Sequence, residues 1–112
     1  MKHIDYSFTD SDILACIFSL TQLHLLHDDD DDISDAQIAI NEQCAVSAGD
    51  KLASGNVDRL TPNELRILCC CITYCNMVCQ GEISTDSETY KECMKYVFTL
   101  NKLDNNLSSQ IF

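Results

Sequence analysis

The feature that most constrains the fold is a set of helix-start signals, of which the clearest is the segment Leu60–Leu65. The hydroxyl of Thr61 can accept the backbone N–H of Glu64, and the Glu64 carboxylate can accept the backbone N–H of Thr61. Pro62 stands at the first helical position, where a missing N–H donor costs nothing. The segment Phe8–Ile13 repeats this arrangement. These signals predict capped α-helices that begin near the start of each half of the chain.

Two further start signals and the apolar spacing extend this pattern to the whole chain. Ser34 and Thr85 begin segments in which apolar residues again recur at helical spacing. Only three Gly and one Pro are present, which favours long helices with few connections. The sequence therefore predicts one all-α domain over residues 1–112. We expect a loose C-terminal tail and four helices, at about residues 9–27, 34–53, 61–80 and 86–103.

The apolar positions also predict which helix faces are buried. The helix expected at residues 61–80 has two apolar stripes and should be the most enclosed element. The helix expected at residues 34–53 has a weaker pattern, with Ile40 and Cys44 at its margin. Its inward positions are assigned to Ile38, Ala39, Ala45, Val46 and Leu52.

The two halves of the chain resemble each other. At an offset of 52, Thr9 and Asp12 match Thr61 and Glu64, and at an offset of 51 the pair Lys51–Leu52 matches Lys102–Leu103. Each half reads as a capped helix, a turn and a second capped helix. We therefore expect two helical hairpins, related by duplication, that pack as a four-helix bundle.

The eight cysteines favour a reduced, cytoplasmic protein over a disulfide-bonded one. Five of them crowd into residues 69–79 on one expected helix, where they point in different directions. The apolar run at residues 13–26 follows acidic residues, not the basic region of a signal peptide. Cys71 and Cys75 with His24 or His27 could bind a metal, but no repeated Cys-x-x-Cys pair supports such a site. We expect core thiols, no metal or cofactor, and no enzymatic activity.

The charge restricts the classes of partner. The net charge is −11, and residues 1–55 carry 11 acids and two lysines. Nucleic acids and anionic membranes both require Lys and Arg for binding, so neither is an expected partner. A basic protein is compatible with this charge.

The run of five consecutive aspartates at residues 28–32 is the least ordinary feature of the chain. It lacks the alternating ligands and the final Glu of a calcium loop, and neighbouring exposed acids provide no environment that separates their pKa values for catalysis. Two interpretations remain: a solvated turn, or an acidic surface that binds a basic partner. The candidate partner-binding residues are Asp28, Asp29, Asp30, Asp31, Asp32 and Asp35.

A short, acidic, all-helical chain with the opening Leu60-Thr61-Pro62-Asn63-Glu64-Leu65 resembles small proteins of phages and mobile elements, among them anti-CRISPR and other anti-defence inhibitors. This resemblance implies a non-enzymatic inhibitor that blocks a basic, nucleic-acid-binding protein. Immunity proteins, which neutralise a toxin, are similar in size and charge. The alternatives are a structural or oligomeric helical module, joined through the apolar faces of residues 61–80 and 86–103, and a metal- or thiol-dependent enzyme.

Overall fold

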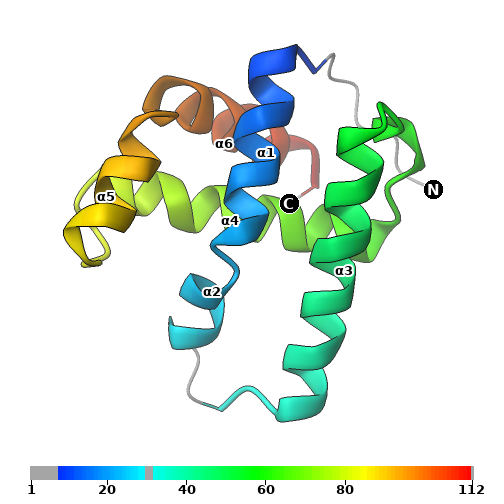
Figure 1. Cartoon of the computed structure of the whole chain (residues 1–112), viewed down its shortest axis with the longest axis horizontal. Helices are drawn as coiled ribbons and strands as arrows, with labels where there is room; N and C mark the ends of the chain where they lie inside the picture. The colour runs from blue at the N-terminus through cyan, green and yellow to red at the C-terminus, as the bar shows by residue number, and fades with distance from the viewer. Residues whose placement is uncertain (1–7, 30–31, 112) are drawn as a thin grey trace.

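The computed structural model describes residues 8–29 and 32–111, which form α-helices and one short 3₁₀ helix, with no strand among them (Figure 1). The all-α class is therefore confirmed. The 3₁₀ helix, η1, spans Val57–Arg59. The α-helices are α1 (Asp10–Thr21), α2 (His24–Asp29), α3 (Asp35–Ala53), α4 (Pro62–Cys79), α5 (Ser87–Met94) and α6 (Val97–Ile111).

Helix α4 is the centre of the molecule, as its two apolar stripes predict. It packs against α1, α3, α5 and α6. Helices α1 and α3 lie side by side and antiparallel, and α4 crosses both (Figure 1). Because α4 crosses α1 and α3 instead of running alongside them, the expected four-helix bundle of two hairpins is not confirmed. The buried side chains that α4 supplies to the core include Ile67, Leu68, Cys69, Cys71, Ile72, Cys75 and Val78.

The first expected helix, at residues 9–27, is interrupted. Helix α1 ends at Thr21, and the N–H of Gln22 donates to the carbonyl of Ser19 at 3.0 Å, which tightens the last turn. In an uninterrupted helix, Leu23 and Leu25 would point about 160° apart, to nearly opposite sides of the helix. The turn at Gln22 and Leu23 separates α1 from α2, and both leucines are buried.

The last expected helix, at residues 86–103, is also interrupted and is longer than predicted. The turn at Lys95 and Tyr96 separates α5 from α6, and the Tyr96 ring stacks on Phe18 of α1 with ring centroids 4.9 Å apart. The expectation that residues 104–106 end the helix was wrong. Asp104 instead accepts hydrogen bonds from Thr73 and Asn76 of α4, so the polar run continues the packed helix and the expected loose tail is helical to residue 111.

The helix starts that the sequence predicted are confirmed, whereas the breaks within the first and last expected helices were not predicted. The reciprocal caps form at both Thr9 and Thr61. At α3, Ser34 accepts the N–H of Gln37 without a reciprocal bond. At α5 the cap is Asp86, which accepts from the N–H of Thr89, in place of the expected Thr85. No helix within the described residues has the length and hydrophobicity needed to cross a bilayer.

Candidate functional site

The acidic candidate residues surround the connection between α2 and α3. Asp28 and Asp29 are the last residues of α2, Asp32 lies in the turn, and Asp35 is the first residue of α3. The side chains of Asp28, Asp32 and Asp35 are exposed. Asp30 and Asp31 lie outside the described residues, as does the side chain of Asp29. The described acids therefore belong to the end of α2, the turn after it and the start of α3, and both helix ends lie below α4 in the view of Figure 1.

A polar network holds the two helices that flank this turn. Asn41 of α3 is buried, and its Nδ2 lies 3.3 Å from Nε2 of His27 in the last turn of α2. Gln37 Nε2 donates to Asn41 Oδ1 at 2.9 Å. The sequence pointed to His27 only as a candidate metal ligand or capping group. Its neighbour Asn41 was missed because a polar residue on an inward helix face has no local signature.

The N-terminus of α3 favours the acids that stand beside it. The Ser34 hydroxyl accepts the backbone N–H of Gln37 at 3.1 Å and fixes the start of the helix. Asp35 then lies in the first turn, where the positive end of the helix dipole stabilises a carboxylate. At α2 the relation is reversed, because Asp28 and Asp29 lie at the negative end of that helix.

The outer side of α3 exposes apolar residues that the sequence did not predict to be exposed. Val46 and Ile40, which we had assigned to the inside and to the margin, are 66% and 50% exposed. Ala39, also expected to face inward, is exposed, whereas Ala45 and Leu52 are buried as expected. Helix α3 packs against α1 and α4 through a face that includes Asn41, Ala45, Ala48 and Leu52. Because apolar residues also lie on its opposite side, the apolar pattern of the sequence does not separate inside from outside.

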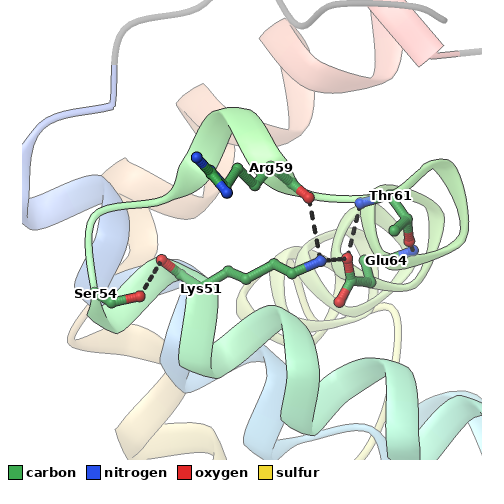
Figure 2. A network of polar contacts seen from close by, with 5 residues as sticks. All are labelled: Lys51, Ser54, Arg59, Thr61 and Glu64. Carbon is green, nitrogen blue, oxygen red and sulfur yellow. Dashed lines mark hydrogen bonds and ion pairs between the residues drawn. The ribbon is translucent and has the colours of Figure 1, made fainter.

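Lys51, the basic residue nearest in sequence to the candidate acids, forms an ion pair with Glu64 of α4. Lys51 is the only Lys or Arg between residues 8 and 55. Its Nζ lies 2.6 Å from Glu64 Oε1 and also donates to the carbonyl of Arg59 at 3.1 Å (Figure 2). The same Glu64 oxygen accepts the N–H of Thr61 at 2.7 Å. Lys51 therefore neutralises the buried carboxylate of Glu64, which caps the start of α4.

The electrostatics of Glu64 reflect this network. Burial by itself raises the pKa of Glu64, but hydrogen bonds from Lys51, Ser47 and Thr61 outweigh burial and lower the pKa to about 2. A comparable pair joins Lys102 Nζ of α6 to Asp12 Oδ1 of α1 at 2.8 Å, and Asp12 is fully buried. Both acids are the third-position residues of reciprocal helix caps. Their arrangement is structural, because each carboxylate is enclosed by its own partners.

The cysteines have the environment of core residues. Burial, as the largest cause, raises the pKa of Cys16, Cys69 and Cys71 to about 12. The hydrogen bond to Cys93 and burial raise the pKa of Cys75 as well. A nucleophilic thiol requires the opposite shift. The hydrogen bond with Cys75 does lower the pKa of Cys93, but Cys93 is fully buried in the core. Within residues 8–29 and 32–111, no group of three or more His, Cys, Asp or Glu side chains is arranged to hold a metal ion.

Comparison with known proteins gives no relative from which a role could be transferred: no protein-family model, no curated protein and no solved structure matches this chain.

Proposed function

We propose that this protein is a non-enzymatic inhibitor that binds a basic, nucleic-acid-binding protein through the acidic surface at the α2–α3 connection. The observation that carries this proposal is the exposure of Asp28, Asp32 and Asp35 in a stretch where residues 8–50 contain no Lys or Arg. A surface of one sign raises the association rate with a partner of the opposite sign and occupies a groove that would otherwise bind phosphates. An anti-defence protein of the anti-CRISPR type is the biological form we favour, and a toxin-neutralising immunity protein would use the same chemistry.

The scaffold supports a binding role for this surface. His27, Asn41 and Gln37 connect α2 to α3, and the cap at Ser34 fixes the first turn of α3. Asp28 and Asp35 are thus attached to helix ends whose positions are held by packing and hydrogen bonds. Acids on a rigid support lose less conformational entropy on binding than acids on a free tail.

We also propose that the scaffold is a duplicated helical unit. The support is reciprocal: Lys51, near the end of the first half, pairs with the cap acid Glu64 of the second half. Lys102, near the end of the second half, pairs with the cap acid Asp12 of the first half. These are the positions that match at offsets of 52 and 51 in the sequence.

An oligomeric helical module is a second candidate, favoured by one specific observation. Phe98 on α6 is 88% exposed, and Leu14 on α1 is also exposed. Large exposed side chains of this kind are common at subunit interfaces. Sedimentation of the native chain and of Phe98→Ser would distinguish this candidate, because a module joined at Phe98 becomes a monomer in the variant.

The experiment that tests the inhibitor proposal compares two variants of equal charge change. The first replaces Asp28, Asp32 and Asp35 by Asn, and the second neutralises three exposed acids of the other half: Asp58→Asn, Glu82→Gln and Glu88→Gln. Immobilised native protein and both variants are exposed to lysate at low and at physiological ionic strength. We expect a basic protein that is retained by the native chain and by the second variant, and lost by the first.

The retained protein is then purified and assayed for binding to its nucleic acid. Addition of the native chain should abolish that binding, and the first variant should not. Equal retention by native protein and both variants, or retention of a partner whose nucleic-acid binding is unaffected, would contradict the proposal.

A further inference from the structure

The outward face of α3 is unusually apolar for a surface that no other described element covers. Its exposed residues follow helical spacing and fall within about half of the helix circumference. A helix that packs on one side is normally polar on the other. We name this surface the α3 outer face, and it comprises Ala36, Ala39, Ile40, Gln43, Val46, Asp50 and Ala53.

The inward side of α3 is already packed against the rest of the molecule. Asn41, Ala45, Ala48 and Leu52 are buried against the rest of the molecule. Ile40 and Val46 therefore have no route into the core without rotating α3 and exposing these buried residues. Their exposure follows from the packing of α3.

The charges along the α3 outer face all have the same sign. Asp50 lies on the face, and Asp35 and Glu42 border it, all of them exposed. Lys51, one residue beyond, turns to Glu64 of α4. Asp32, also exposed, lies in the turn that leads into the N-terminal end of α3. A matching partner must therefore present apolar side chains flanked by cations.

We propose that the α3 outer face docks an amphipathic helix of the partner whose apolar stripe is bordered by Lys and Arg. Alanines at residues 36 and 39 let another helix backbone approach closely, at about 8–10 Å between axes. Helix α3 has 19 residues and is about 28 Å long, which matches a partner helix of similar length. This inference rests on the proposed function: it names the structural class of the segment that the acidic surface attracts.

The test uses a synthetic 18-residue peptide as probe, with Leu on one helical face and Lys on both borders. A control peptide has the same composition in an order that gives no apolar face. Binding to the full chain is measured by calorimetry. The native chain should bind the first peptide and prefer it to the control, because only the first can bury Ile40 and Val46.

Two double variants locate the contact. Ile40→Ser/Val46→Ser should weaken peptide binding at least about tenfold, because the complex then no longer buries these two aliphatic side chains against the peptide. The matched control, Leu14→Ser/Phe98→Ser, removes exposed apolar side chains elsewhere and should bind like the native chain. All four positions are at the surface, and circular dichroism of each variant checks that the helices remain.

The outcomes separate this inference from the proposed function. If Ile40→Ser/Val46→Ser binds the peptide normally, or if both peptides bind equally, the helix-docking inference is overturned. If that double variant instead converts a native dimer to a monomer, the occupant is a second copy and the inference is also overturned. Loss of the lysate partner in the Asp28, Asp32 and Asp35 variant would still support the proposed function in either case.

Discussion

Removing the lysine of the buried Lys51–Glu64 pair should be more damaging than removing its acid. The Glu64 side chain is 4% exposed and the Lys51 side chain is 29% exposed. In Lys51→Met the carboxylate stays buried without its cation. In Glu64→Gln the ammonium can turn to water, and the amide oxygen can still accept the N–H of Thr61 (Figure 2).

The magnitude follows from the shifted ionisation of Glu64. A fall of the pKa from 4.5 to about 2 corresponds to about 3 kcal/mol of stability at neutral pH. Because the pKa is lower in the folded state, this contribution is complete above pH 4.5 and is lost as the pH falls toward 2. We expect Lys51→Met to cost about 3–5 kcal/mol and Glu64→Gln about 1–2 kcal/mol at pH 7.

Urea denaturation of the native chain and both variants provides the assay. At pH 7 the free energies of unfolding should rank native, Glu64→Gln, then Lys51→Met. The difference between native and Glu64→Gln should shrink as the pH is lowered from 5 to 2, because protonation of Glu64 removes the interaction. If Glu64→Gln costs as much as Lys51→Met, or if their difference from the native chain is independent of pH, the assignment of Glu64 as a charged, lysine-stabilised cap is refuted.

Three further predictions test the packing. Gly49→Ala should stabilise the protein by about 0.5–1 kcal/mol, since its added Cβ would lie 4.0 Å from a Leu20 methyl in ordinary contact; thermal denaturation that shows a loss would contradict this. Leu107→Ala should cost about 2–5 kcal/mol in urea denaturation because Leu107 is buried, whereas a loose tail would give no change. In the native protein a bulky thiol reagent should modify only the half-buried thiols and reach the other five after unfolding; early labelling of all eight would contradict the burial. The half-buried thiols are those of Cys44, Cys70 and Cys79.

The parts of the fold that the sequence predicted are those decided within one helical turn. The caps at Thr9 and Thr61 each depend on residues three positions apart, so their pattern is visible in the chain itself. The expected ranges 34–53 and 61–80 agree closely with α3 and α4, and Gly81, with φ of +77°, adopts the left-handed conformation that ends the helical path after α4.

The parts that could not be predicted depend on contacts between distant segments. The break before α6 accompanies stacking of Tyr96 on Phe18, far away in sequence. Asp104 continues α6 because Thr73 and Asn76 of α4 donate to it, whereas the local pattern indicates a helix end. The exposed α3 outer face escaped prediction for a related reason: both sides of α3 are apolar, and only its contacts with α1 and α4 select the inner one.

The placement of the cations explains why the acidic surface is so one-sided. Lys51 and Lys102 neutralise the buried acids Glu64 and Asp12, which would be costly to leave without a cation. Lys51 is the only Lys or Arg in residues 8–55, and its charge therefore stabilises the fold through the pair with Glu64. The exposed acids of α2 and α3 carry charges of the same sign, and the repulsion between them opposes folding of that end of the molecule. The exposed acids, together with the exposed Ile40 and Val46, support the proposed basic amphipathic partner, because dispersed charges alone would provide solubility without exposed aliphatic side chains.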